Sequence, residues 1–210
     1  MKIFSRISAS LFIITLLGFF SFVSVNKVQA APTCNATTGN WSDPSIWSGA
    51  CTGVDGIPSS SDSVGIDADV VVTVNTAGAV ASSITFWDHQ DTVNGINVVS
   101  PGTLTVSNQI DLTPMSSDFG NSTIDVGDGT LSVANINIDG DGYGDGFGPV
   151  ALSVSTGTIN VSGDITFSGI AENAQLISTG DSTINIGGSL TSGGTLTTSG
   201  TGTINFNGSG

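Results

Sequence analysis

Basic residues are almost missing from this chain. Its three Lys and Arg residues all precede residue 31, whereas its 17 acidic residues all follow residue 30. If the first 30 residues are removed, the remaining chain therefore has a formal net charge of −17. Binding to nucleic acid or to an anionic bilayer depends on clusters of Lys and Arg. The composition excludes a basic patch of either kind after residue 30.

Helix-forming residues are also scarce, since Glu172 is the only glutamate and no stretch has helical periodicity. Val, Ile and Leu alternate instead with Ser, Thr, Asn and Asp in short runs that glycines separate. Alternation with a period of two predicts half-buried strands, and the Gly and Asx residues between them predict tight turns. The same alternation argues against low-complexity disorder, which the 29 glycines would otherwise favour.

The first 30 residues are typical of a secretory signal peptide. Lys2 and Arg6 precede the apolar run of residues 11–20, and Ala30 provides a small residue before a cleavage site. An uncleaved membrane anchor is the alternative, but the apolar run is shorter than the ~20 residues that a spanning helix needs. We therefore expect a mature protein that is secreted, extracellular or on the cell surface, with no membrane segment after signal cleavage.

Only two cysteines are present, Cys34 and Cys51. Two cysteines in an exported chain most often form a disulfide, and a Cys-based metal site would lack a nearby histidine. The cysteines lie together with two tryptophans in residues 31–62. We expect these residues to form a compact cap, because the open end of a stacked β-structure needs to be covered.

The C-terminal half repeats a short segment four times, with central aliphatic residues 20 to 35 positions apart. The copies are Ser122–Gly127, Gly157–Gly163, Ser182–Gly188 and Gly202–Gly208. One unit cannot bury its own apolar edge, but stacked units place matching residues in columns with a spacing of ~4.8 Å. We expect one inward aliphatic column and one outward polar ladder. The column would contain Ile124, Ile159, Ile184 and Ile204, and the ladder Asp125, Asn160, Asn185 and Asn205.

These patterns predict an all-β fold, a right-handed parallel β-helix (solenoid) over residues 63–210 with a disulfide-stapled N-terminal cap. An antiparallel β-sandwich is the alternative, although its hairpins would need two-residue turns between longer strands. Because the sequence stops inside a repeat, we expect the solenoid to be truncated and further C-terminal repeats to follow in a longer chain.

The start of the mature chain resembles that of bacterial secreted β-helix surface proteins. Residues 40–47 read Asn-Trp-Ser-Asp-Pro-Ser-Ile-Trp, followed by Pro58, by residues 62–66 and by the Gly-Thr-Ile-Asn repeats. This pattern is similar to the opening of adhesins and autotransporter passengers, and to the start of G8-type domains. The resemblance implies a cell-surface or extracellular protein of the adhesin type, and it carries no catalytic residues with it.

The densest acidic motif is residues 139–146, which read Asp-Gly-Asp-Gly-Tyr-Gly-Asp-Gly. Asp139, Asp141 and Asp145 could converge on Ca²⁺, which takes six to eight oxygen ligands. The motif is not an EF-hand, because Tyr143 occupies a ligand position and no glutamate closes the loop. The alternative is an acidic, solvated turn. These three aspartates are therefore a candidate calcium site, and we expect no other cofactor.

No residue pattern selects a catalytic site. The most chemically dense segment, residues 87–91, contains the only histidine, His89, but a lone histidine in an Asx-rich turn is more often a surface residue. Outward threonines could bind ice, yet Thr on the outer face of a strand is ordinary β-propensity.

We therefore expect a structural or adhesive module that is not an enzyme. The expected partner is a host or neighbouring-cell surface component or glycan. The alternative is a carbohydrate-binding or carbohydrate-active protein that acts on a neutral glycan, since hydrolysis of such a glycan needs only two carboxylates.

Overall fold

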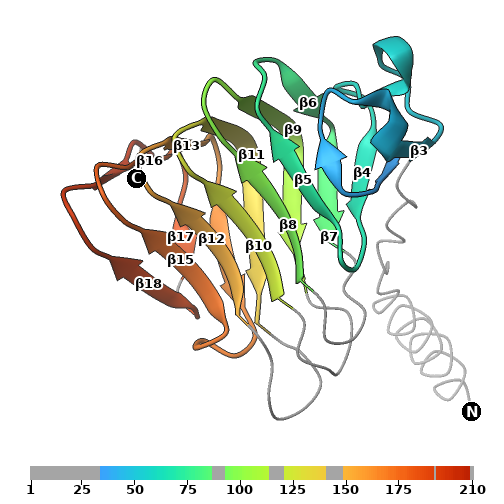
Figure 1. Cartoon of the computed structure of the whole chain (residues 1–210). Coiled ribbons are helices and arrows are strands. Elements are labelled where there is room, and N and C mark those ends of the chain that lie inside the picture. Colours follow the sequence, from blue (N-terminus) through green and yellow to red (C-terminus); the bar gives the residue numbers. More distant parts are fainter. Residues whose placement is uncertain (1–33, 87–92, 114–120, 141–148, 192, 209–210) are drawn as a thin grey trace, which may run out of the picture. The chain divides into compact units, whose positions relative to one another are not determined.

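The computed structural model of the protein describes residues 34–86, 93–113, 121–140, 149–191 and 193–208. Within these residues the chain is almost entirely β-strand, with two short 3-10 turns, η2 (Pro44–Ile46) and η3 (Val54–Gly56). The strands stack into a parallel β-solenoid (Figure 1). The predicted all-β parallel solenoid is confirmed, and the antiparallel sandwich is excluded.

The predicted signal peptide, residues 1–30, lies outside the described residues. In the part of the chain that the structure describes, no helix has the length and apolar character to cross a membrane.

Each coil contributes strands to three faces. The first face is a seven-stranded sheet formed by β2 (Gly39–Asn40), β5 (Val71–Val74), β8 (Val93–Val98), β10 (Asn121–Val126), β12 (Val150–Val154), β15 (Ala174–Ser178) and β18 (Thr195–Thr198). The second and third faces belong to one 12-stranded sheet, because two long strands cross from one face to the other. These long strands are β9 (Thr103–Leu112) and β11 (Thr130–Asp139).

The remaining strands complete the 12-stranded sheet. The second face contains β6 (Ala79–Ala81), β13 (Thr158–Val161), β16 (Thr183–Ile186) and β19 (Thr203–Phe206), with the first halves of β9 and β11. The third face contains β1 (Cys34–Ala36), β3 (Trp47–Gly49), β4 (Ser63–Ile66), β7 (Ser83–Phe86), β14 (Ile165–Ser168) and β17 (Leu190–Thr191), with the second halves of β9 and β11.

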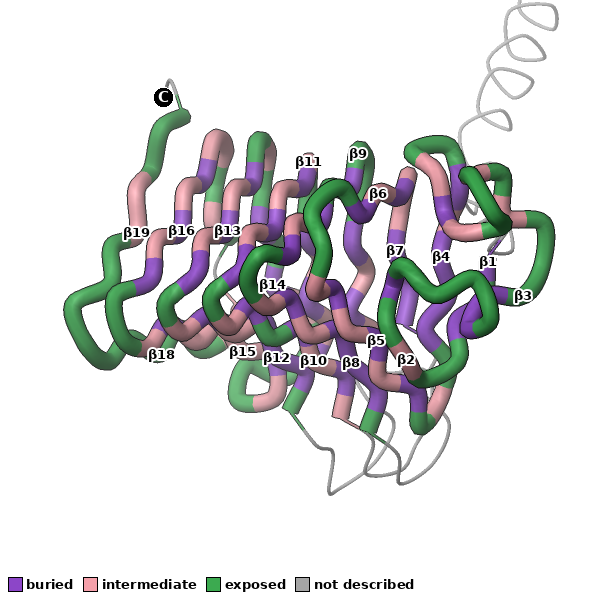
Figure 2. Tube along the Cα trace, turned by 45° about the horizontal axis from the view of Figure 1, so that its top comes forward, coloured by how far each residue is buried: buried purple, intermediate pink, exposed green. Residues whose placement is uncertain are grey.

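Aliphatic residues stack coil upon coil inside the solenoid. On the second face, Ile159 pairs with Leu131 on one side and with Ile184 on the other, and Ile184 pairs with Ile204. Side chains alternate between the two sides of a strand, so buried and more exposed positions alternate along the chain (Figure 2). Full burial of such a side chain contributes about 1.5–3 kcal/mol. The predicted column of Ile159, Ile184 and Ile204 is confirmed.

Ile124 does not belong to this column, contrary to the prediction. It lies on β10 of the first face, where it pairs with Ile96 and Leu152. Leu131, on the next strand along the chain, occupies the second-face position below Ile159. The interval between Ile124 and Ile159 therefore joins two different faces. Strand alternation shows which side chains point inward, but it does not distinguish the faces of a solenoid.

Residues 34–62 cover the N-terminal end of the solenoid. Strand β1 pairs in parallel with β4 and antiparallel with β3. Trp41 packs edge-on against Trp47 with ring centroids 4.9 Å apart, and Trp47 Nε1 donates a hydrogen bond to Trp41 O at 2.8 Å. A disulfide joins Cys34 to Cys51 across a sequence separation of 17 residues. The predicted pairing of the two cysteines is confirmed.

Candidate functional site

Two rows of polar side chains run along the outside of the second face, with one residue in each coil. The first row, the Thr ladder, consists of Thr103, Thr130, Thr158, Thr183 and Thr203. The second row begins with Thr105 and Ser132 and continues as the Asn ladder, which consists of Asn160, Asn185 and Asn205. The alternation of side chains places both rows outside because the aliphatic column between them points inward.

Hydrogen bonds between coils fix the amides of the Asn ladder. Asn185 Nδ2 donates to Asn160 Oδ1 at 2.8 Å, and Asn205 Nδ2 donates to Asn185 Oδ1 at 2.9 Å. A side-chain amide has two N–H groups and two acceptor lone pairs. After both ladder bonds, Asn185 therefore keeps one donor and one acceptor for a ligand.

The predicted ladder is correct for its three asparagines and wrong for Asp125. Asp125 lies on β10 of the first face, between Asn97 and Ser153 of the neighbouring coils. Its Oδ1 accepts a hydrogen bond from Ser153 Oγ at 2.9 Å. The error has the same cause as that for Ile124, because both residues belong to the repeat copy that lies on a different face.

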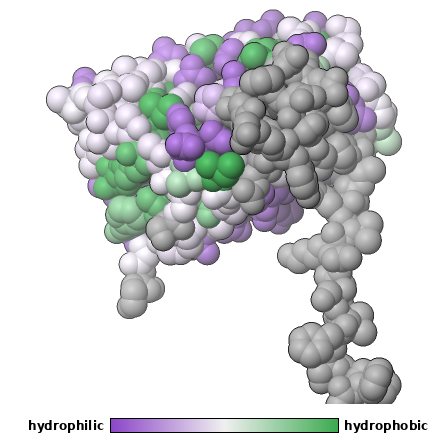
Figure 3. All heavy atoms as spheres, turned by 90° about the horizontal axis from the view of Figure 1, so that it is seen from below, coloured by the Kyte–Doolittle hydropathy of each residue, from purple (hydrophilic) through white to green (hydrophobic). Residues whose placement is uncertain are grey.

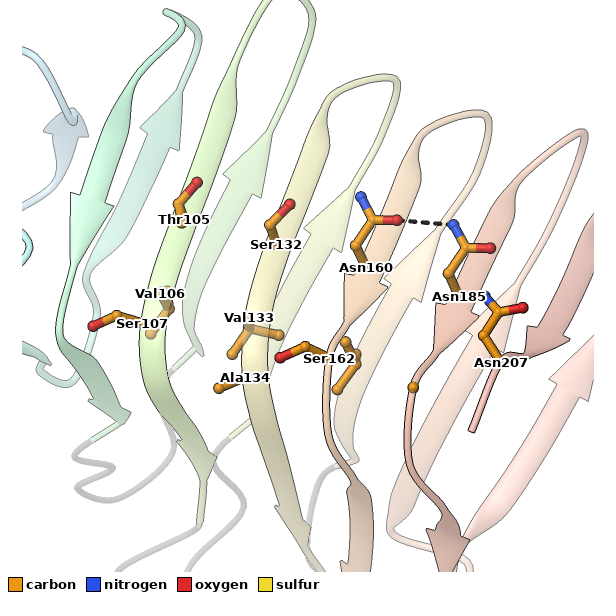
Figure 4. A pocket seen from close by; sticks show the side chains of 12 residues that line it. Thr105, Val106, Ser107, Ser132, Val133, Ala134, Asn160, Ser162, Asn185 and Asn207 are labelled. Carbon is orange, nitrogen blue, oxygen red and sulfur yellow. Dashed lines mark hydrogen bonds between the residues drawn. The ribbon is translucent and has the colours of Figure 1, made fainter. Parts of the chain in front are cut away.

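A shallow groove of about 460 Å³, the ladder groove, runs beside the Asn ladder across several coils (Figure 4). It is lined by Thr105, Val106, Ser107, Ser132, Val133, Ala134, Asn160, Val161, Ser162, Asn185, Gly187 and Asn207. Gly187 permits a close approach of two coils, since an added Cβ would lie 2.3 Å from Ser162 O. The lining combines hydroxyl and amide groups with a larger apolar surface and has no charged side chain. It therefore suits a neutral ligand that offers both hydrogen-bonding groups and apolar faces.

Carboxylates elsewhere on the solenoid bond to neighbouring coils. Asp164 Oδ1 accepts hydrogen bonds from Ser189 N at 2.7 Å and from Ser189 Oγ at 2.9 Å. Both bonds hold the pKa of Asp164 below its ordinary value, and the bond from the Ser189 backbone has the larger effect. Asp128 Oδ1 similarly accepts from Ser100 N at 2.6 Å. Among the described residues, no group of three or more His, Cys, Asp or Glu side chains is placed to hold a metal ion.

The structure leaves the candidate calcium site untested. Asp139 is half-buried at the end of β11, opposite Ser168 of β14. Asp141 and Asp145 lie outside the described residues, and so does His89. Calcium binding by Asp139, Asp141 and Asp145 stays a prediction.

One buried carboxylate organises the cap. Asp62 is only 1% exposed, and its Oδ2 accepts hydrogen bonds from Thr52 N at 2.9 Å, Ser59 N at 2.8 Å and Thr52 Oγ1 at 3.0 Å. Burial raises the pKa of Asp62, but these hydrogen bonds together outweigh burial, and the pKa lies below its ordinary value. Ionised Asp62 therefore fixes both ends of the loop from Thr52 to Ser59.

Replacing Asp62 with Asn is expected to lower the free energy of unfolding by about 1–3 kcal/mol at neutral pH, because the N–H groups of Thr52 and Ser59 lose a charged acceptor. Because folding lowers the pKa of Asp62, its contribution is fully present above the unfolded pKa of about 3.9 and is lost as the pH falls through the folded pKa. Urea unfolding of both proteins from pH 7 to pH 2 measures this difference. Asp69→Asn is the matched control, since Asp69 is exposed. A difference that persists unchanged at pH 2 would contradict the assigned role of Asp62.

A second hollow of about 390 Å³, the cap pocket, lies between the cap loop and the corner that joins β5 to β6. It is lined by Trp41, Ser42, Gly53, Val54, Ile57, Pro58, Ser59, Ser60, Thr76, Ala77, Gly78, Ala79 and Val80. The sequence does not indicate this pocket, because its walls come from loops and from the start of β6, which share no repeat pattern. The Asp55-Gly56 pair indicates a turn, but nothing in the sequence connects that turn to Val80.

Comparisons with known proteins do not place this architecture in a family. No family model matches the chain, and no curated protein or solved structure matches it either.

Proposed function

We propose that the protein is a secreted or cell-surface structural module that adheres to a neutral glycan through the ladder groove. The observation that carries the proposal is the uncharged and periodic lining of the groove, in which Asn160 and Asn185 present side-chain amides in neighbouring coils. Export follows from the predicted signal peptide. The expected adhesive role and the alternative of carbohydrate binding thus become one proposal.

The inter-coil hydrogen bonds support binding by a rigid surface. Asn185 is bonded on both sides, to Asn160 and to Asn205, so its amide orientation is fixed before any ligand arrives. Groups that are ordered in advance lose little conformational entropy on binding. A repeating ligand that lies along the solenoid axis would meet a side-chain amide in each of the three coils of the Asn ladder, ~4.8 Å apart.

The charge of the chain favours a neutral ligand over an anionic one. All 17 acidic residues and no basic residue follow residue 30, so an anionic polysaccharide would be repelled at long range. Of the described residues on the face shown in Figure 3, most have intermediate hydropathy, and the hydrophilic and hydrophobic ones form separate patches. Sugar hydroxyls can accept from the remaining amide N–H groups of the Asn ladder and donate to their oxygens.

The lining supports binding more than cleavage. Hydrolysis of a neutral glycan uses two carboxylates about 5–10 Å apart. None of the described residues that line the ladder groove is Asp or Glu. We therefore propose a non-catalytic role.

Binding to an array of neutral and acidic glycans, followed by calorimetry, tests the proposal. We expect a neutral glycan to bind with little dependence on salt, because no ion pairs form. The double variant Asn160→Ala/Asn185→Ala should bind at least tenfold more weakly, about 1.4 kcal/mol, which corresponds to one or two hydrogen bonds. Thr158→Ala/Thr183→Ala is the control, because these residues lie on the same strands but outside the groove. Binding only to acidic glycans, or an equal loss in the control, would contradict the proposal.

A further inference from the structure

The cap pocket has a rigid rim. The loop from Gly53 to Ile57 is closed by hydrogen bonds from Gly53 N to Ile57 O at 3.0 Å and from Gly56 N to Gly53 O at 3.2 Å. The disulfide at Cys51 and the hydrogen bonds to Asp62 hold the two flanks of this loop. Such ordering before binding lowers the entropic cost of capturing a ligand.

The rim presents a large apolar side chain to solvent. Val54 is 78% exposed. It precedes two residues in the left-handed region, Asp55 with φ 58° and Gly56 with φ 81°. Left-handed backbone is uncommon for a residue other than glycine and concentrates at ligand-contacting sites. Val54 therefore adds an exposed apolar side chain to the wall of the hollow.

The wall of the pocket contains an unused hydrogen-bond donor. Trp41 is 2% exposed, and its Nε1 has no hydrogen-bond partner in the described structure. Buried donors are nearly always paired, because an unpaired one loses the hydrogen bond that it makes to water in the unfolded chain. Trp47, its aromatic neighbour, uses its own Nε1 to bond Trp41 O. Trp41 therefore keeps an unpaired buried donor beside the cap pocket.

The charges around the cap pocket define its ligand. The lining is apolar with a few hydroxyls, whereas the exposed residues Asp43 and Asp55 directly follow the lining residues Ser42 and Val54. The chain after residue 30 has no cation to neutralise them. Apolar walls with carboxylates at the edge complement an aliphatic side chain that is flanked by positive charge.

We propose that the cap pocket binds an aliphatic side chain of a basic polypeptide segment, with cationic neighbours of that side chain beside Asp43 and Asp55. This site is independent of the ladder groove, because the two hollows share no lining residue. It gives the module a protein partner at its capped end in addition to a ligand on its second face.

Three blocked tripeptides of defined chemistry test the proposal on the mature chain. The probe is acetyl-Lys-Leu-Lys-amide, and its controls are acetyl-Glu-Leu-Glu-amide and acetyl-Lys-Ser-Lys-amide. We expect the probe to shift the methyl NMR signals of Val54 and Val80 saturably, and both controls to bind at least tenfold more weakly. High salt should weaken binding of the probe, because exposed ion pairs are screened.

Variants distinguish the cap pocket from a nonspecific apolar contact. Val54→Ser should weaken binding of the probe at least fivefold, and Asp55→Asn about twofold to threefold, since solvent screens an exposed ion pair and leaves it a small contribution. Val93→Ser is the matched control, because Val93 is 52% exposed on β8, outside the pocket, and it should leave affinity unchanged. Equal binding of the acidic peptide, unshifted Val54 and Val80 signals, or an equal effect of Val93→Ser would each overturn the proposal.

Discussion

Replacing Leu131 with Ala is expected to lower the free energy of unfolding by about 2–5 kcal/mol, which is the range for large-to-small substitutions in a packed core. Leu131 is fully buried, and it pairs with Leu104 in one neighbouring coil and with Ile159 in the other. The stability of a solenoid depends on contacts between neighbouring units, so a cavity here weakens the coupling to both coils. Urea or thermal unfolding followed by circular dichroism measures the loss.

The adjacent residue provides the control for this prediction. Ser132 points outward on the same strand and is half-buried, so Ser132→Ala should change stability by less than about 0.5 kcal/mol. If Leu131→Ala also costs less than that amount, Leu131 does not occupy the inward column. That outcome would restore Ile124 as the residue below Ile159.

Removing the disulfide is expected to cost about 3 kcal/mol, because the bond closes a loop of this length in the unfolded chain. The double variant Cys34→Ala/Cys51→Ala tests this, with Ala chosen because Cys34 is fully buried and Ser would place a hydroxyl in the core. The loop that carries Val54 should then open at lower denaturant concentration than the coils.

Reduction of the wild-type protein supplies an independent measurement. Dithiothreitol should destabilise the wild type by the same amount as the double variant and should leave the variant itself unchanged. Equal stability of the oxidised wild type and the double variant would show that the bond does not constrain the cap.

The sequence predicts the solenoid because the alternation of inward and outward side chains along a strand depends only on neighbouring residues. In Gly157–Gly163, Thr158 and Asn160 alternate with Ile159, and this period-two pattern indicates an inward aliphatic side chain between two outward polar ones. Two further copies repeat that pattern 25 and 20 residues later, so Ile159, Ile184 and Ile204 could be placed in one column.

The assignment of residues to faces could not be predicted in the same way. The copy around Ile124 has the same alternation as the copy around Ile159, although the two lie on different sheets. Coil length also varies along the chain, as the 20-residue step from Ile184 to Ile204 and the 28-residue step from Ile124 to Leu152 show. Only the hydrogen-bond register between coils decides which face a strand joins.

The two hollows differ in how far the sequence indicated them. The Asn ladder follows from the repeat, since the outward position after each central isoleucine is Asn in three copies. The cap pocket depends on a loop and a strand that contact each other only after folding, so Val54 and Val80 share no sequence pattern. Asp62 precedes the first regular strand, and its sequence context indicates an exposed turn. Its burial results from the folded loop around it and has no signal in the sequence.

Backbone NOEs in the isotope-labelled mature protein test the central claim, the parallel stacking of coils in this register, most directly. The structure predicts interstrand NOEs that connect Asn185 to Asn160 and to Asn205, and others that connect Asp125 to Asn97 and to Ser153. NOEs that join Asp125 to Asn160, or that pair these strands antiparallel, would contradict it.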